Sequence, residues 1–347
     1  MALATLIAMT DSEQLVVDAA RYLRLDPYCS SRPRFVGLPD ANALLSSVDN
    51  DCRNGWRSRL LRMTDRDTAF LYVPNHVYWE VYEKLPRLAR FSPVPVADLR
   101  RHFEEEYLPA LRFVKVSTTE IADPQVLAIT DPDDVPLGQL AKLIAPCIVF
   151  SEDRHLRTPG LAPADWRLAA KFAVDLADGA SKQQATGMVA IAPGWAGVEL
   201  VKLLSRKSGL SPWLLGAALL GGAAILLRKP ERRQVAVKYA QPIIESLGQV
   251  IEAAMAQEHR GLAGLHEVIL PAAEAPAAKQ QVAIVLARQR EPLLAREVQE
   301  LIEGYFPAGT VPTIAEVRSV LSEGAEFVRT ERYRWQFGRD AGLWRPR

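Results

Sequence analysis

The sequence predicts an α/β fold built on a mostly parallel sheet. From Arg34 onward, short apolar runs alternate with segments in which apolar residues recur at helical spacing. The composition is that of a globular protein, 49% hydrophobic and 24% charged. Strands that alternate with helices are typical of βαβ units, in which ligands bind at the carboxyl ends of the strands. We therefore look for a functional site at that edge.

Each predicted element is a contiguous stretch with one periodicity. The strand candidates are RFVGLP (34–39), AFLYVP (69–74), RFVKVS (112–117) and CIVF (147–150). The helix candidates between them and beside them are 41–63, 75–85, 96–110 and 131–145.

The chain is long enough for two or three domains. We expect an N-terminal extension, an α/β domain, a helical region, a linker rich in Pro and Ala, and a small C-terminal domain, at 1–33, 34–160, 161–270, 271–279 and 280–347.

Charge and cysteine content exclude several protein classes. The net charge is +1, so any surface that binds nucleic acid must be local. The three cysteines are Cys29, Cys52 and Cys147, and no C-x-x-C occurs, which argues against a disulfide framework and a zinc knuckle. The N-terminus lacks the basic region of a signal peptide. We expect a cytoplasmic protein.

The segment 210–227 is an uncharged run of 18 residues. That length is at the lower limit for a transmembrane helix. A pair of spans would place the basic turn SRKSG outside, against the positive-inside rule. We expect a buried helix, and the alternative is a protein attached to the inner membrane through this segment.

Four acids fall at the predicted carboxyl edge of the sheet. Asp40 follows the first strand, Glu80 lies on the helix after the second, and Asp134 begins a helix; Asp153 follows the fourth strand. Clustered carboxylates repel one another unless a cation lies among them. Oxygen ligands favour Mg²⁺ or Mn²⁺, either of which can stabilise charge on a phosphate under attack.

Each acid also has an ordinary structural interpretation. An Asp after a strand is often a helix N-cap or a turn residue. Asp131 and Asp133 are close alternatives to Asp134, which we prefer because it directly precedes the apolar helix. The structural interpretation becomes weaker because all four acids fall together at the carboxyl edge of the predicted sheet.

The motifs around these acids resemble those of PIN-domain nucleases. FVGLPDANALLSS is similar to the first family motif, LYVPNHVYWEV looks like the second, and DPDDVPLGQLAKLIAPCIVFSEDRHL resembles the third and fourth together. The resemblance covers about residues 34–160, and Pro136 and Gly138 depart from the pattern.

The resemblance implies a set of site roles. Asp40, Glu80, Asp134 and Asp153 would hold Mg²⁺ or Mn²⁺ and form the catalytic group. Asn42 would brace Asp40, and Ser151 would hold a water on the metal. The family implies RNA cleavage, most often by toxins of toxin–antitoxin systems, which would add an antitoxin-type inhibitor as a partner. The chain is much longer than a minimal toxin.

Three residues beside the acids have two interpretations each. Arg154 and His155 either contact substrate phosphate or are solvated loop residues. Trp79 either stacks a base or belongs to the core.

The C-terminal segment resembles a winged helix. Helices are predicted at 282–290, 293–306 and 312–324, the last opened by the capping box Thr313–Glu316, and a hairpin at 327–338. Winged helices often bind duplex DNA through the third helix and the wing. The candidate contacts are Arg318, Arg329, Arg332 and Arg334. The alternative is a protein-interaction or dimerisation module, since the third helix is mainly acidic.

Together these observations predict a Mg²⁺- or Mn²⁺-dependent endonuclease, with single-stranded RNA as the preferred substrate. The alternative is a catalytically inactive PIN-fold scaffold or DNA-binding regulator. A homodimer is a further candidate assembly.

Overall fold

A computed structural model describes residues 35–65, 69–117, 123–179, 249, 252–306 and 311–340. It divides into two compact units, one of residues 1–177 with 260–347 and the other of residues 178–259. Most of the second unit lies outside the described residues, as do the N-terminal extension and the apolar segment 210–227. Among the helices that the structure describes, none combines the length and the apolarity that crossing a bilayer needs.

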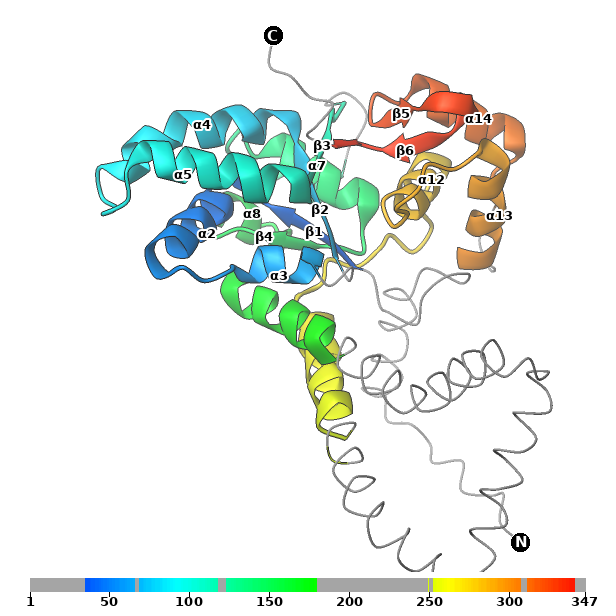
Figure 1. The fold of residues 1–347 in the computed structure, drawn as a ribbon. Coiled ribbons are helices and arrows are strands. Elements are labelled where there is room, and N and C mark those ends of the chain that lie inside the picture. The colour runs from blue at the N-terminus through cyan, green and yellow to red at the C-terminus, as the bar shows by residue number, and fades with distance from the viewer. Residues whose placement is uncertain are drawn as a thin grey trace, which may run out of the picture. The chain divides into compact units, whose positions relative to one another are not determined.

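The first unit is an α/β fold around a five-stranded sheet, which confirms the predicted fold class at that level (Figure 1). The strands are ordered β4-β1-β2-β3-β7, and the first four are parallel. Their bounds are β1 Phe35–Pro39, β2 Ala69–Pro74, β3 Leu111–Val114, β4 Ile148–Phe150 and β7 Arg339–Asp340. The four parallel strands are those that the sequence predicts.

Most helices of the α/β part overlap predicted segments, but the predicted helix 41–63 is interrupted at 55–58, and the short helices at 124–127 and 154–157 were not predicted. The helices are α2 Ala41–Asn54, α3 Arg59–Asp65, α4 Asn75–Ala89, α5 Val96–His102, α6 Pro124–Leu127, α7 Val135–Ile144 and α8 Arg154–Arg157. After α5 the chain continues as a π-helix, Phe103–Tyr107, and a 3-10 turn, Leu108–Ala110, so the predicted helix 96–110 is present with altered winding. Helices also span 166–179 and 252–268.

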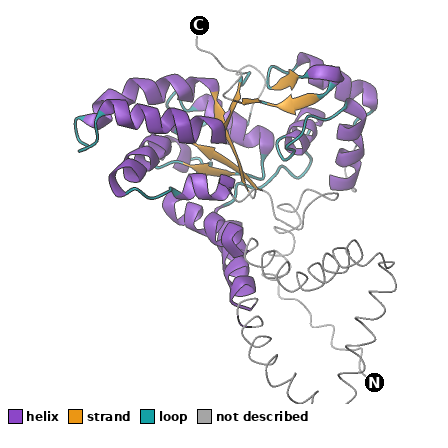
Figure 2. Cartoon of the chain, in the orientation of Figure 1, coloured by secondary structure: helices purple, strands orange, loops and turns teal. Residues whose placement is uncertain are grey.

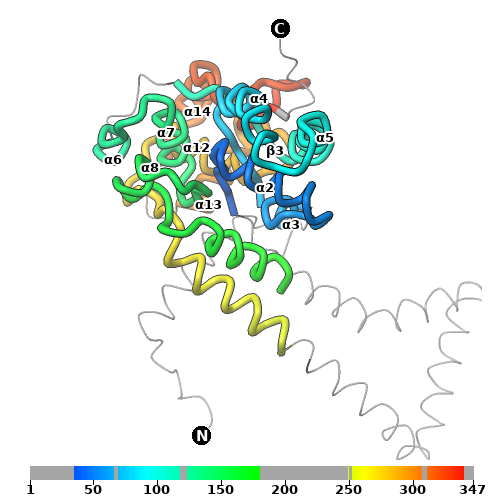
Figure 3. The backbone as a smooth tube through the Cα atoms, turned by 90° about the vertical axis from the view of Figure 1, so that its left-hand side faces the viewer, coloured from blue at the N-terminus to red at the C-terminus, as the bar shows by residue number. Residues whose placement is uncertain are grey.

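Helices cover both faces of the sheet (Figures 2 and 3). Alternate residues of each strand point to opposite faces, as the period of a strand requires. Phe35, Leu71 and Ile148 pack against α2–α5 and the helix at 166–179. Val36, Tyr72 and Val149 pack against α7 and α12–α14 on the other face. Each face therefore has its own buried core.

The C-terminal elements are three helices and a two-stranded antiparallel hairpin. They are α12 Ala278–Leu286, α13 Ala295–Tyr305, α14 Ile314–Glu323, β5 Phe327–Arg329 and β6 Trp335–Phe337, with the 3-10 turn Glu331–Tyr333 between the two strands. The predicted capping box is present: the Thr313 hydroxyl accepts a hydrogen bond from the Glu316 backbone N–H, and the Glu316 carboxylate accepts one from the Thr313 backbone N–H.

These C-terminal elements share the core of the α/β part. Val282, Ile302 and Phe337 belong to the same buried cluster as Leu140 of α7. The following strand β7 extends the main sheet by pairing with β3. The compact unit therefore continues across the exposed connection that the sequence predicts as a linker.

Candidate carboxylate site

Asp40 lies directly after β1 and begins α2. Its Oδ1 accepts a hydrogen bond of 2.5 Å from the backbone N–H of Ala43, so Asp40 is the N-cap of the helix. Its Oδ2 accepts a hydrogen bond from the hydroxyl of Ser151. The residue is 6% exposed, and its burial raises the pKa of the carboxyl to about 6 despite both hydrogen bonds.

Ser151 joins two of the predicted acids. It follows β4, whose parallel register places Phe150 beside Pro39 of β1. Besides donating to Asp40, its hydroxyl oxygen accepts from the backbone N–H of Asp153 at 3.0 Å. The resemblance gives Ser151 a role in holding water, whereas in this structure it orients Asp40.

Asp153 caps α8, as its ordinary structural interpretation predicts. Its Oδ1 accepts from the backbone N–H of His155 at 2.8 Å. His155 in turn contacts Thr130 through Nδ1. The N-cap interpretation therefore holds for Asp40 and Asp153, and these caps place two carboxylates at neighbouring strand ends.

Asp134 differs from those two acids because its carboxylate caps nothing. It occupies the N-cap position of α7, but its side chain makes no capping hydrogen bond. Its Oδ2 is buried and has no hydrogen-bond partner among the described residues. Burial and, to a smaller extent, the charges of Asp153, Asp131, Asp40 and Glu80 together raise the pKa of Asp134 to about 7. The structure thus brings the four predicted acids within electrostatic reach of one another.

Glu80 is held by a cation that the sequence analysis did not assign to the site. Lys84, one turn further along α4, donates a hydrogen bond of 2.5 Å to Glu80 Oε1. The same ammonium donates to the side-chain oxygen of Asn42 at 3.2 Å. Asn42 therefore meets Lys84 rather than bracing Asp40. The signal for Lys84 was present in the sequence, since Glu and Lys four residues apart on a helix pair readily.

A histidine also borders the acids. His76, in the first turn of α4, has its pKa lowered by burial, while the charges of Glu80 and Asp133 act in the opposite direction. His76 therefore lies within electrostatic reach of Glu80 and of Asp133, the alternative to Asp134. Its neighbour in sequence, Asn75, begins α4 as predicted.

The side chains of this site suit a hard divalent cation by their chemistry. All four acids offer oxygen, the ligand type of Mg²⁺ and Mn²⁺. The buried oxygen of Asp134 without a partner and the raised pKa values of Asp40 and Asp134 indicate negative charge that the described residues leave uncompensated. Within the described ranges, however, no group of three or more Asp, Glu, His or Cys side chains is already arranged to hold a metal ion.

The predicted contact arginines lie in two regions. Arg154 is exposed at the start of α8, directly after Asp153, and Arg318 is exposed on α14. In the hairpin, the Arg329 guanidinium lies 4.2 Å from the ring centre of the exposed Tyr333, and Arg332 is exposed with φ 57°. Arg334 instead donates to Pro292 O at 2.9 Å and to Glu297 at 3.3 Å. Arg334 therefore fastens the hairpin to α13, and binding of duplex DNA stays a prediction.

Trp79, which neighbours Glu80, is 49% exposed. Its ring meets that of Tyr78 edge-on, with 5.1 Å between ring centres. Of the two interpretations of this tryptophan, the exposed fraction argues against the one that places it in the core.

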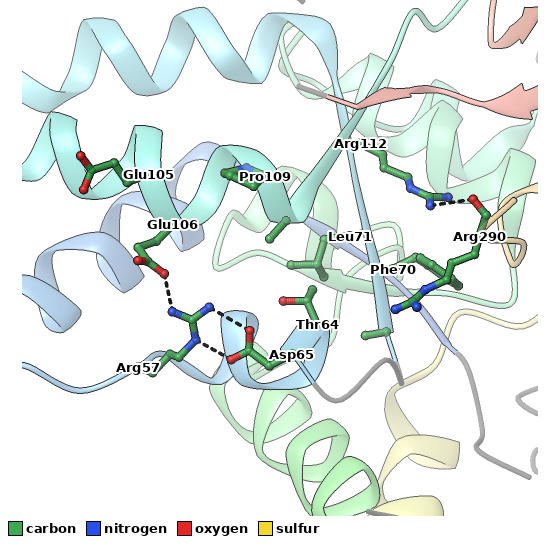
Figure 4. A pocket seen from close by; sticks show the side chains of 12 residues that line it. Arg57, Thr64, Asp65, Phe70, Leu71, Glu105, Glu106, Pro109, Arg112 and Arg290 are labelled. Carbon is green, nitrogen blue, oxygen red and sulfur yellow. Dashed lines mark hydrogen bonds and ion pairs between the residues drawn. The ribbon is translucent and has the colours of Figure 1, made fainter. Parts of the chain in front are cut away.

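A hollow of about 470 Å³ opens at the amino ends of β2 and β3, away from the acids (Figure 4). Arg57 lies beside it and forms ion pairs with Asp65 and Glu106. Arg112 donates to backbone carbonyls of Gln289 and Arg290. Because these cations already have partners, the hollow lacks the unbalanced charge that marks the carboxylate site.

Comparison of the chain with models of protein families gives no match. Comparisons with curated proteins and with solved structures give none either.

Proposed function

We propose that the chain is a PIN-type endonuclease that depends on Mg²⁺ or Mn²⁺ and hydrolyses phosphodiester bonds, with single-stranded RNA as its substrate. The observation that carries the proposal is the state of Asp134. Its carboxylate has a buried oxygen without a hydrogen-bond partner among the described residues. Burial and four neighbouring acids together raise its pKa to about 7. A buried carboxylate of this kind destabilises the folded protein unless a bound ligand compensates its charge.

Each residue has a role in this proposal. Asp40, Asp134 and Asp153 would hold the metal directly, and Glu80 would join them when Lys84 leaves it. When bound, the cation would supply Lewis-acid stabilisation of the charge that develops on the phosphate. Ser151 orients Asp40 through its hydrogen bond. Arg154, exposed beside Asp153, would contact a substrate phosphate, and the exposed ring of Trp79 would stack a base.

A second candidate function is a scaffold without catalysis. Two observations favour it: Lys84 neutralises Glu80, and Asp40 and Asp153 already serve as helix caps. Under this alternative the acids are structural, and no metal-dependent activity exists.

Cleavage of single-stranded RNA in Mn²⁺ and in EDTA separates the two functions. We expect cleavage by the wild type in Mn²⁺ only, and a loss of at least about a hundredfold for Asp40→Asn and Asp153→Asn, because each loses a charged ligand. Asp123→Asn is the matched control, since Asp123 also caps a helix, α6, but does not contribute to the charge around Asp134.

Two outcomes would refute the enzymatic function. The first is wild-type cleavage that persists in EDTA. The second is an Asp40→Asn variant that cleaves as well as the Asp123→Asn control.

A further inference from the structure

A second, smaller hollow lies at the same edge of the sheet as the acids. It measures about 220 Å³ and is lined by residues of the main sheet and of the C-terminal elements. Asn75 begins α4, Phe113 lies in β3, and Lys115 follows β3, while Glu326 precedes β5 and Arg339 lies in β7. Asn75 directly precedes His76, which the charge of Glu80 reaches. The hollow and the carboxylate site therefore both involve residues at the start of α4.

Glu326 is a buried carboxylate that the described residues satisfy only in part. The residue is 2% exposed. Its Oε1 accepts from the backbone N–H of Ser117 and from Lys279 Nζ, each at 3.2 Å. Its Oε2 is buried and has no hydrogen-bond partner among the residues that the structure describes. Buried polar atoms in proteins are almost always paired, so Oε2 calls for a hydrogen-bond donor.

Asn75, which also lines the hollow, presents the same need. Its Oδ1 is buried and finds no hydrogen-bond partner in the described part of the chain. Two acceptor atoms thus lie in residues that line one small hollow. A ligand that satisfies both must carry at least two hydrogen-bond donors.

Two positively charged side chains line the same hollow. Lys115 and Arg339 are both exposed, and neither forms an ion pair with any residue that the structure describes. Phe113 and Val328 supply apolar surface. The ligand chemistry that fits is a flat ring with donors on one edge and a negative group attached to it.

From this geometry we infer that the hollow binds an unpaired guanine nucleotide. Guanine offers two adjacent donors, N1–H and N2–H₂, on the edge that an unpaired base exposes, and its phosphate would meet Lys115 or Arg339. The hollow is smaller than the roughly 300–1,000 Å³ of sites for drug-sized ligands, which suits one base. As a feature of the substrate strand this inference rests on the proposed nuclease function, and it would make the enzyme cut beside guanines.

Binding of free nucleotides in EDTA tests the hollow without cleavage. Calorimetric titration of the full chain with GMP, AMP, CMP and UMP should give a dissociation constant for GMP at least tenfold lower than for the others. Glu326→Gln should weaken GMP binding at least tenfold, whereas Glu303→Gln, on the exposed face of α13, should leave it unchanged.

Lys115→Ala provides a variant whose folding is not at risk, because the side chain is exposed. It should weaken binding of GMP but not of guanosine, which lacks the phosphate. Equal binding of all four nucleotides, no binding of GMP, or an unchanged affinity in both Glu326→Gln and Lys115→Ala would overturn the inference.

The result of the GMP-binding experiment can be distinguished from the result of the RNA-cleavage experiment. GMP binding with the expected variant effects, in a protein that never cleaves RNA, would support the guanine site and refute the nuclease. Metal-dependent cleavage without preference for guanine, in a protein that does not bind GMP, would do the reverse.

Discussion

At the scale of single residues, the site is defined by how each carboxylate is held. Asp40 and Asp153 are fixed by backbone N–H groups and by Ser151, whereas Asp134 has an oxygen without a partner. The placement of Asp40 and Asp153 was predictable, because each follows an apolar run that forms a strand, and that of Glu80 and Asp134 followed from the helices on which they lie or which they begin. The roles of Asn42, Ser151 and Lys84 were not predictable, because they depend on contacts between separate elements.

The raised pKa of Asp134 makes stability depend on pH. Its pKa rises from 3.8 to about 7 on folding, so the contribution of Asp134 to stability is full below about pH 4 and is lost as the pH rises through 7. Asp134→Asn cannot ionise. In EDTA at pH 8 we expect this variant to be more stable than the wild type by about 1–2 kcal/mol, after allowance for solvent screening of a partly exposed group.

Urea unfolding of both proteins at pH 5 and pH 8 checks this expectation. The advantage of Asp134→Asn should be clearly larger at pH 8 than at pH 5, because the folded-state carboxyl of the wild type ionises near pH 7. An advantage of the same size at both values would mean that the ionisation of Asp134 does not cause it.

Under the proposed function, Lys84 would compete with a metal ion for Glu80. Lys84→Gln removes the ammonium that holds Glu80 Oε1, so we expect Mn²⁺ to raise the melting temperature of this variant by several degrees more than that of the wild type. Lys171→Gln is the control, because Lys171 pairs with Asp175 in the same i,i+4 arrangement away from the acids. Equal Mn²⁺-induced shifts in the wild type and in both variants would show that Glu80 takes no part in binding metal.

At the scale of elements, local sequence patterns predicted most of the structure. The four parallel strands, α4, α7 and the capping box of α14 lie where periodicity and capping residues indicate. The strand β7 was missed, because it is two residues long and follows Gly338, and nothing local indicates that it pairs with β3.

Gly138 is a further case that tertiary packing explains. A Cβ atom on this residue would lie 2.4 Å from the Cδ1 of Ile129, so any larger residue here would require the Ile129 side chain to move.

Arg288 connects two elements through backbone groups. It is 1% exposed and donates to the carbonyls of Ile284 in α12, Ile144 at the end of α7, and Pro146. Burial lowers its pKa to about 10. Arg288→Met keeps the apolar stem but leaves these carbonyls without donors, at about 1–3 kcal/mol each.

We therefore expect Arg288→Met to lose at least about 3 kcal/mol of unfolding free energy, measured by urea denaturation. Arg296→Met, an exposed arginine on α13, should stay within about 0.5 kcal/mol of the wild type. If both variants matched the wild type, the contacts of Arg288 would contribute nothing to holding α12 against α7.

At the scale of the whole molecule, the C-terminal elements complete the α/β part. Their apolar residues share one buried cluster with α7 and β4, and β7 joins the main sheet. Sequence patterns alone suggested a boundary at 271–279, because an exposed stretch of Pro and Ala resembles a linker. Whether the segment after an exposed stretch forms a separate domain depends on long-range packing, and a local sequence pattern carries no information about such packing.

The central claim is that the four carboxylates form a site for a divalent cation. Anomalous diffraction from crystals soaked in MnCl₂ at pH 8 tests this claim most directly. We expect one strong anomalous peak within about 2.0–2.3 Å of carboxylate oxygens of Asp40, Asp134 and Asp153, absent from crystals of Asp134→Asn. A map with no peak among these acids, in crystals that take up Mn²⁺ elsewhere, would contradict the account.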